Sequence, residues 1–226
     1  MESSESFPAI VEFPAAGAWR VARRASPGSF AELTPQDAAL PNAGNRFDVL
    51  GGGVLYAATR LEGCYAETLA RFRPSPRVLA AIRSDDGYMN AGSVPADWRE
   101  RRCKFEIRCL DPLPFLDVED PLTHTYLTSQ MAAVLVSLGV NTPLDVASLR
   151  GANRLLTRAI ALWAYGATDE QDLPVYSGIR YKSRLGDWEC WAIFQGTELE
   201  FGPSQGLEPE DSTLASTAAQ FGLVIH

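Results

Sequence analysis

The sequence is poor in the residues that enzymes use most often to bind metals or to activate a nucleophile. Histidine occurs twice in 226 residues, as His124 and His226, and the four cysteines show no Cys-x-x-Cys spacing. Zinc sites are built from such clusters, and a Ser-His-Asp triad needs a histidine beside its nucleophile. The sequence therefore predicts no metal site. Carboxylates, arginines, tyrosines and hydroxyls are left as the candidate functional groups.

Long apolar runs and an excess of basic residues are also missing. The best apolar run, residues 131–138, is far shorter than the ~20 residues of a membrane span. Residues 1–6 are acidic, whereas a signal peptide begins basic and continues apolar. With 20 Lys and Arg against 28 Asp and Glu, the formal net charge is −8, which repels the phosphates of nucleic acids. We expect a cytoplasmic protein that binds neither membranes nor nucleic acid directly.

The composition that remains is that of one folded domain. The chain is 46% hydrophobic and 21% charged, values typical of a soluble globular protein with a sizeable core. Residues 1–16 are interrupted by prolines and are predicted to be a loose N-terminal segment. Residues 17–226 are predicted to form the domain, with a polar loop over residues 26–45.

Hydrophobic periodicity predicts an α+β (mixed α/β) arrangement with a largely antiparallel sheet and flanking helices. Residues 102–110 alternate apolar and polar side chains, as in a half-buried strand. Gly139 and Gly166 follow two helical patterns, as glycine does at helix ends. The predicted strands are 19–22, 54–58, 102–110, 179–181, 188–194 and 221–225, and the predicted helices are 63–72, 121–138, 153–165 and 212–220.

Taken singly, the polar residues near these elements have ordinary structural explanations. Glu67 and Arg71 are four residues apart, the spacing of a surface ion pair on a helix. Tyr56 lies within an apolar strand, and Ser183 lies in a turn. At 100° per residue, however, Glu67 falls at the border of the apolar face of the 63–72 helix, where a side chain can face a cleft.

The order of these residues along the chain resembles the RES domain family, which is named for an Arg, a Glu and a Ser. The resemblance covers about residues 18–200, and three features depart from it: Phe47 and Asp48 replace the usual Trp and Asn, and Gly51–Gly53 replaces a Pro-Gly turn. The segments that carry it are Asn45-Arg46-Phe47-Asp48, Val54-Leu55-Tyr56-Ala57-Ala58, Ala66-Glu67-Thr68-Leu69, Arg154-Leu155-Leu156-Thr157, Gly178-Ile179-Arg180-Tyr181-Lys182-Ser183 and Cys190-Trp191-Ala192-Ile193-Phe194.

This resemblance implies a fold similar to that of the ADP-ribosyltransferases and an activity that consumes NAD. Cleavage of the nicotinamide–ribose bond passes through an oxocarbenium-like cation, which Glu67 would stabilise. Arg46 and Arg20 would bind the pyrophosphate through bidentate hydrogen bonds. Tyr56 would stack on nicotinamide, and Ser183 would hydrogen-bond an amide or hydroxyl. The expected catalytic residues are Glu67, Arg46 and Ser183, and the expected NAD-binding residues are Arg20, Arg46, Tyr56 and Ser183.

The resemblance also implies a biological role. Family members commonly act as toxins of toxin–antitoxin pairs, so an Xre-type antitoxin is the expected partner, and operator binding is expected of that partner. The acceptor in the reaction stays open between water (a glycohydrolase), phosphate (a phosphorylase) and protein. Two alternatives to the NAD-degrading toxin remain: a protein ADP-ribosyltransferase and a non-catalytic RES-like binding domain. Whether the chain forms a homodimer is also left open.

Overall fold

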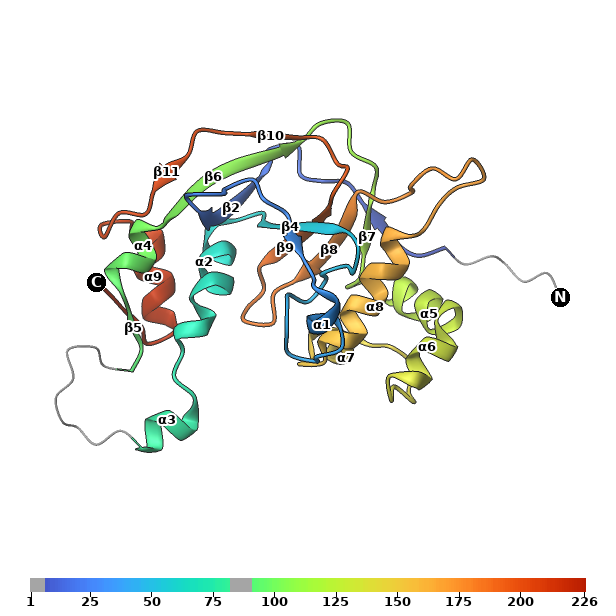
Figure 1. Ribbon diagram of the computed structural model, residues 1–226, viewed down its shortest axis with the longest axis horizontal. Helices are drawn as coiled ribbons and strands as arrows, with labels where there is room; N and C mark the ends of the chain where they lie inside the picture. The colour runs from blue at the N-terminus through green and yellow to red at the C-terminus, as the bar shows by residue number, and fades with distance from the viewer. Residues whose placement is uncertain (1–6, 82–90) are drawn as a thin grey trace.

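The computed structural model describes residues 7–81 and 91–226, which form one mixed α+β domain. Figure 1 shows a curved sheet along one side of the molecule and helices along the other. The predicted α+β class with flanking helices is confirmed. The likeness to ADP-ribosyltransferases stays a prediction.

Within the described residues, the main sheet contains ten strands. Eight follow the order β1-β7-β8-β9-β4-β2-β6-β10, and the other two lie off this path, with β3 paired to β4 and β11 paired to β6. The β7–β8 pair is parallel and the other pairs are antiparallel, as predicted for the sheet as a whole. Its strands are β1 (Ile10–Val11), β2 (Ala18–Arg23), β3 (Ala31–Glu32), β4 (Gly53–Ala58), β6 (Arg102–Cys109), β7 (Phe115–Asp117), β8 (Gly178–Lys182), β9 (Glu189–Phe194), β10 (Leu199–Phe201) and β11 (Gln205–Gly206). Two further strands, β5 (Ser93–Val94) and β12 (Val224–Ile225), pair in parallel apart from this sheet.

Most helices form two groups beneath the sheet, with α2, α4 and α9 at one end and α5 to α8 at the other, while α3 lies apart from both (Figure 1). Capping residues explain several helix starts: Asp120, Asn153 and Asp211 each accept a hydrogen bond from the backbone of the first turn of α5, α8 and α9. The helices are α1 (Pro35–Ala38), α2 (Leu61–Leu69), the 3-10 turn η1 (Ala70–Phe72), α3 (Pro76–Ala81), α4 (Ala96–Glu100), α5 (Pro121–Gln130), α6 (Ala132–Ser137), α7 (Val146–Arg150), α8 (Arg154–Tyr165) and α9 (Ser212–Gln220).

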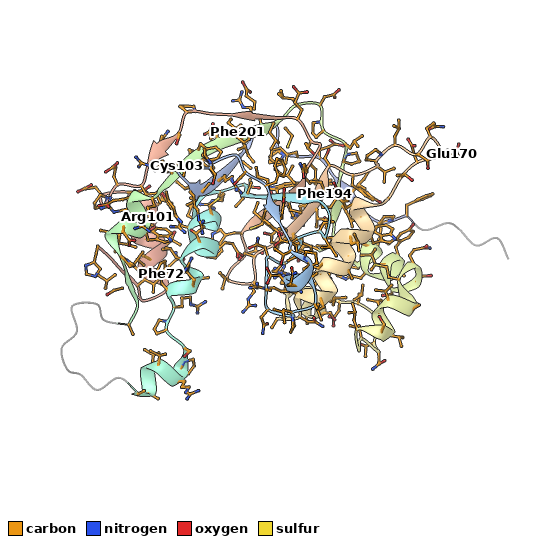
Figure 2. All side chains as sticks on the ribbon, viewed as in Figure 1. Phe72, Arg101, Cys103, Glu170, Phe194 and Phe201 are labelled. Atoms are coloured by element: carbon orange, nitrogen blue, oxygen red, sulfur yellow. The ribbon has the colours of Figure 1, made fainter. Side chains whose placement is uncertain are left out.

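Strand β4 separates two parts of the hydrophobic core because its side chains alternate between the faces of the sheet. Val54 and Ala58 pack in the cluster between the sheet and α5 to α8, whereas Leu55 and Ala57 pack on the opposite face of the sheet. Figure 2 labels Phe194 of β9 near the centre of the molecule, where its ring packs edge-on to that of Tyr165 at 5.2 Å. A third cluster joins α2, α4 and α9.

The N-terminal prediction is wrong for part of its range. Ile10–Val11 pairs with Leu116 and Phe115 of β7, and Phe13 is 8% exposed, with its ring 5.0 Å from that of Trp191. This aromatic packing attaches the segment to the sheet, which is why residues 10–13 are not loose. Residues 1–6 of the same predicted segment lie outside the described residues.

Other boundaries also differ from the sequence prediction. The predicted 121–138 helix is divided at Met131, whose backbone (φ −109°, ψ 15°) leaves the helical region while its side chain stays buried. The predicted loop over residues 26–45 contains β3 and α1, and the last strand is confined to Val224–Ile225. Strands β3 and β12 are short and pair with distant partners, β4 and β5, which periodicity does not detect.

The site is positioned by a split in the sheet between β2 and β4. Strand β2 pairs with β6 over six residues and β4 pairs with β9 over five, but β2 and β4 are in register at one position, Trp19 opposite Ala58. Beyond that position the two strands diverge. The side chain of Arg20 bridges the opening, since its Nη1 donates to the carbonyl oxygen of Tyr56 at 2.7 Å.

Candidate active site

A cavity of about 700 Å³ lies below this split. It is bounded by β2 and β4, by α2 and the turn after it, by the loop before β4, by the start of α8, and by the β8–β9 connection. The cavity therefore lies between the two helix groups seen in Figure 1. Its volume falls within the range of small-molecule and cofactor sites.

The charge of the cavity is opposite to that of the chain. Among the described residues, its lining contains six arginines and one carboxylate, that of Glu67, whereas the whole chain carries a formal net charge of −8. Clustered guanidinium groups favour an anionic ligand with planar oxygen pairs, such as a phosphate. The six arginines are Arg20, Arg46, Arg71, Arg73, Arg154 and Arg184.

Glu67 and Ser183, which are 116 residues apart in the sequence, meet at the wall of this cavity. The Ser183 hydroxyl donates to Glu67 Oε1 at 2.6 Å and accepts the backbone N–H of Leu185 at 3.0 Å. Ser183 is 1% exposed, while Glu67 is accessible to the cavity from α2. These two hydrogen bonds fix the hydroxyl, so Ser183 orients the Glu67 carboxylate from its buried side. A surface ion pair of Glu67 with Arg71 is not formed in the described part of the chain.

Tyr56 projects from β4 into the lining of the cavity, and its hydroxyl is bound on the inner side. The hydroxyl donates to Asp48 Oδ1 at 2.8 Å and accepts the backbone N–H of Phe47 at 3.1 Å. Burial and the Asp48 carboxylate raise the pKa of Tyr56 well above its usual value. Tyr56 therefore stays a neutral donor to Asp48, and its ring is the part that can contact a ligand.

Arg46 lies across the cavity wall and contacts both aromatic rings and backbone. Its guanidinium carbon is 5.4 Å from the ring centroids of Phe47 and of Tyr181, and its Nη2 donates to the carbonyl oxygen of Leu149. Its Nε is buried without a hydrogen-bond partner among the described residues. Burial lowers the pKa of Arg46, although Tyr181 and Glu67 oppose that shift. Nη1 and Nη2 of Arg46 each donate to one backbone carbonyl, of Lys182 and of Leu149, and each keep a second N–H. Arg46 therefore retains donors for a ligand while it holds the cavity wall together.

Arg20 is more fully committed to the fold. Its Nε donates to the carbonyl oxygen of Pro27 at 3.0 Å, its Nη2 to that of Ser29 at 3.0 Å, and its Nη1 to that of Tyr56. Three of its five N–H groups are therefore used on backbone carbonyls, and two remain. The structure brings Arg20 to the cavity as predicted, but its main contacts join the split strands.

Sequence reasoning missed three arginines at the cavity that lack such contacts. Arg71, Arg73 and Arg184 are exposed, and in the described part of the chain none of their guanidinium groups forms a hydrogen bond or ion pair. Arg73 stacks over Phe221 at 4.8 Å, and Arg71 over Phe72 at 5.6 Å. Arg184 follows Ser183 directly in the sequence, and the spacing of Arg71 from Glu67 indicates only an ion pair. The available signal was their closeness in sequence to the predicted site residues.

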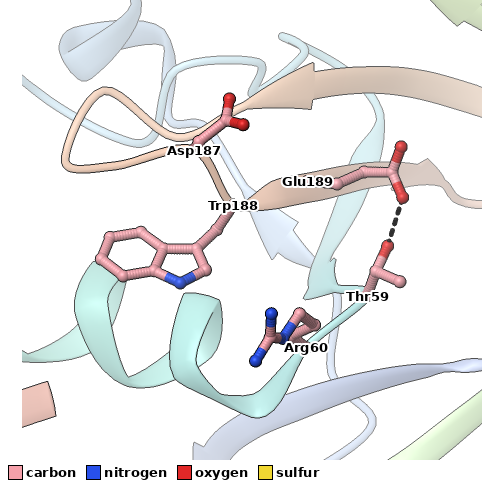
Figure 3. Close-up of a pocket in the computed structure, with 5 residues that line it drawn as sticks. All are labelled: Thr59, Arg60, Asp187, Trp188 and Glu189. Atoms are coloured by element: carbon pink, nitrogen blue, oxygen red, sulfur yellow. Dashed lines mark hydrogen bonds between the residues drawn. The ribbon is translucent and has the colours of Figure 1, made fainter.

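A second cleft, of about 500 Å³, lies beside the first turn of α2 (Figure 3). The polar side chains at this cleft are largely engaged in hydrogen bonds and ion pairs with neighbouring side chains. The Thr59 hydroxyl donates to Glu189 Oε2 at 2.6 Å, and Arg60 pairs with Glu62 at 2.9 Å. The indole of Trp188 forms another wall. We place the candidate site in the first cavity, where arginines without such partners face an oriented carboxylate.

In the part of the chain that the structure describes, no group of three or more His, Cys, Asp and Glu side chains is placed to hold a metal ion. None of the helices in residues 7–81 and 91–226 is long and apolar enough to cross a membrane.

A solved structure and a family model match the chain. The chain covers 88% of one chain in the crystal structure of the M. tuberculosis MbcT-MbcA toxin–antitoxin complex, at 14% sequence identity over 90% of its own length, with a TM-score of 0.47. No curated protein matches the sequence. The family model of the RES domain matches residues 18–206, which include Arg20, Arg46, Tyr56, Glu67 and Ser183. The chain belongs to the RES domain family.

Proposed function

We propose that this RES domain is an NAD-consuming toxin that cleaves the bond between nicotinamide and ribose. The observation that carries the proposal is the Glu67 carboxylate, oriented by Ser183 at 2.6 Å on the wall of a cavity lined by six arginines. NAD is a dianionic pyrophosphate with two flat bases and a bond that breaks toward a cation. The cavity offers groups of the right kind for each of these features.

The chemistry assigned to Glu67 is electrostatic. As the bond between ribose C1′ and the nicotinamide nitrogen breaks, its electron pair leaves with nicotinamide and the ribose becomes an oxocarbenium-like cation. A fixed carboxylate beside that cation stabilises it without reorganising, which is the most effective kind of electrostatic catalysis. The acceptor, water or phosphate, then adds to C1′. Ser183 is buried, so we assign it to orienting Glu67.

The pyrophosphate is assigned first to the arginines that retain free donors. The guanidinium groups of Arg71, Arg73 and Arg184 form no hydrogen bond in the described structure and line the cavity. Arg46 adds the one N–H that each of Nη1 and Nη2 keeps beside its bond to a backbone carbonyl. Guanidinium groups bind phosphate oxygens in a bidentate fork. Tyr56 is assigned to stacking, because its hydroxyl is already bound to Asp48 at 2.8 Å.

The toxin role rests on membership of the RES family. An enzyme that degrades NAD harms the cell that makes it, so a partner must restrain it during growth. We propose an antitoxin of Xre type that covers the arginine-lined cavity with carboxylates, from acidic side chains or a chain end. Because the toxin is acidic overall, any operator contacts belong to that partner.

The experiment compares Glu67→Gln with the purified wild type in a nicotinamide-release assay. Glutamine is nearly isosteric, so the variant should fold normally and lose about 10²–10³ in kcat. Glu62→Gln is the matched control, because Glu62 lies on the same helix but pairs with Arg60 outside the cavity. Glu62→Gln should retain activity within about threefold of the wild type.

Each alternative has its own result in this assay. Nicotinamide released together with a labelled protein acceptor would identify a protein ADP-ribosyltransferase. An intact wild type that leaves NAD unchanged would identify a non-catalytic domain. A folded Glu67→Gln variant within about threefold of wild-type turnover, which is less than ~0.7 kcal/mol of barrier, would remove Glu67 from the mechanism.

A further inference from the structure

The connection between β8 and β9 meets helix α2 at two points. One is the hydrogen bond between Ser183 and Glu67 described above. The other is the packing of Trp188, whose indole is drawn in Figure 3, against Gly63 in the first turn of α2. Gly63 and Glu67 are four residues apart on this helix, so they lie on one face, one turn apart. Both contacts of this connection with α2 therefore lie on one face of the helix.

Trp188 fits its position closely because two glycines leave room for it. A Cβ atom added to Gly63 would lie 3.0 Å from Trp188 Cβ and 3.0 Å from Ala58 Cβ. A Cβ atom added to Gly186 would lie 2.4 Å from Cζ3 of the Trp188 ring. On its outer side the ring meets Phe221 edge-on, with centroids 6.4 Å apart. The indole is thus held between α2, its own loop and the end of α9.

Trp188 is also joined directly to Ser183. Lys182 and Glu189 form the last pair of the β8–β9 ladder, and the next two residues are joined because Ser183 N–H donates to the Trp188 carbonyl oxygen at 2.8 Å. The position of Trp188 on α2 therefore sets the position of Ser183 on α2. The hydroxyl of Ser183, in turn, donates to Glu67 of α2 and accepts the backbone N–H of Leu185 within this connection.

We infer that Trp188 is a positioning residue, which sets the register of Ser183 against Glu67 from the second cleft. This inference rests on the proposed function for its catalytic consequence, whereas its geometry stands without it. A displacement of about 1 Å at a catalytic group can cost 10²-fold in rate. Loss of the indole should therefore lower kcat by a larger factor than it raises the KM for NAD, because only one of the six arginines at the cavity, Arg184, lies on this connection.

The test compares Trp188→Ala, Trp188→Phe and a matched control, Trp163→Ala. Trp163 is a half-buried tryptophan on α8 that packs on Tyr126 and Tyr176, remote from the β8–β9 connection. Two measurements are made on each protein: hydrogen exchange at the backbone amides of Ser183 and Leu185, and the kcat and KM of nicotinamide release. The exchange measurement does not depend on any activity.

We expect Trp188→Ala to speed exchange at both amides by at least about tenfold, since both bonds depend on the docked loop. It should lower kcat at least about tenfold and raise KM by a smaller factor. Phenylalanine should restore most of both values, and Trp163→Ala should change neither. If Trp188→Ala fails to fold, Gly186→Ala replaces it, because its new Cβ displaces the indole within an intact core.

Unchanged exchange in a folded Trp188→Ala, or equal effects from Trp163→Ala, would overturn the inference. Faster exchange together with unchanged kcat would also overturn it, since Ser183 would then move without consequence. A wild type that shows no NAD cleavage, with exchange that responds as expected, would refute the proposed function and leave the positioning of Ser183 by Trp188 supported.

Discussion

The arginines at the cavity differ in what their guanidinium groups contact. Arg20 donates to three backbone carbonyls, and Arg154 donates to the carbonyl oxygens of Asn42 and Gly44. Arg184 makes no hydrogen bond within the described structure, although it lines the same cavity. A guanidinium bound to the backbone stabilises the fold, whereas one without partners is available to a ligand. Residue type alone does not make this distinction.

This difference predicts opposite effects for two substitutions. Arg184→Ala should raise the KM for NAD by about tenfold, through loss of one charge-assisted contact, and change the free energy of unfolding by less than ~0.5 kcal/mol. Arg20→Ala should lower the free energy of unfolding by about 2–3 kcal/mol, because three carbonyls lose their donor. Urea unfolding and steady-state kinetics measure the two effects. A stable Arg20→Ala with a raised KM would show that Arg20 binds NAD directly.

Tyr56 offers a second test at the scale of one residue. Its hydroxyl donates to the buried Asp48 and its ring faces the cavity. Tyr56→Phe should therefore lower the free energy of unfolding by about 1–3 kcal/mol, because a buried carboxylate loses a donor. It should keep kcat/KM within about threefold, since the stacking ring remains. Tyr56→Ala should lose binding as well. Equal losses of kcat/KM in the two variants would assign the hydroxyl to catalysis.

Among the elements, helix α2 carries the site because it is fixed on several sides. Tyr65 of α2 donates to Asp211 Oδ2 at 2.6 Å, and Lys104 of β6 pairs with the same oxygen at 2.5 Å. Asp211 also caps α9 through the backbone N–H groups of Thr213 and Leu214. One carboxylate, 7% exposed, thus joins α2, α9 and β6.

Asp211→Asn should loosen this junction in a pH-dependent way. Burial raises the pKa of Asp211, but hydrogen bonds from Lys104 and Tyr65 outweigh it, so the net shift is downward. A lowered pKa in the folded state stabilises the protein above the unfolded value of ~3.9 and ceases to do so as the pH falls through the folded value. Asparagine keeps the cap and loses the charge, so the variant should be less stable by about 2–3 kcal/mol at pH 7.

The measurement is urea unfolding of wild type and Asp211→Asn between pH 7 and pH 2.5. The difference between them should be full at pH 7 and should shrink below about pH 4. Asp97→Asn is the control, because Asp97 pairs with Arg101 on the surface with a side chain 55% exposed. A difference that stays constant across the pH range would show that the charge of Asp211 does not stabilise the junction.

At the scale of the whole molecule, apolar periodicity predicts the elements that present a continuous apolar face to the core. It misses the features that depend on contacts between residues far apart in the sequence. The alternating strand over residues 102–110 and the helix over residues 153–165 were found because each presents a continuous apolar face. The split between β2 and β4 was not predictable, since it depends on a single register position, Trp19 opposite Ala58. For the same reason the sequence indicated Glu67 and Ser183 only through family resemblance, not through their 2.6 Å contact.

The distribution of charge over the whole molecule leads to a prediction about its partner. The six arginines gather at one cavity of a chain whose formal net charge is −8, so an acidic partner is attracted to the cavity and repelled elsewhere. A restraining partner that uses this attraction must occupy the site that we assign to the NAD phosphates. NAD and the partner should therefore exclude one another.

Calorimetry measures that exclusion: the product of the adjacent gene is titrated into the chain with and without saturating NAD. We expect Arg184→Ala to weaken binding of NAD and of the partner by about tenfold each, because both lose the same unpartnered guanidinium. Arg101→Ala is the control, since Arg101 pairs with Asp97 outside the cavity and its removal should affect neither ligand. Undiminished binding of both ligands at once would show that the partner restrains the enzyme from another surface. The arginine-lined cavity would then serve the dinucleotide alone.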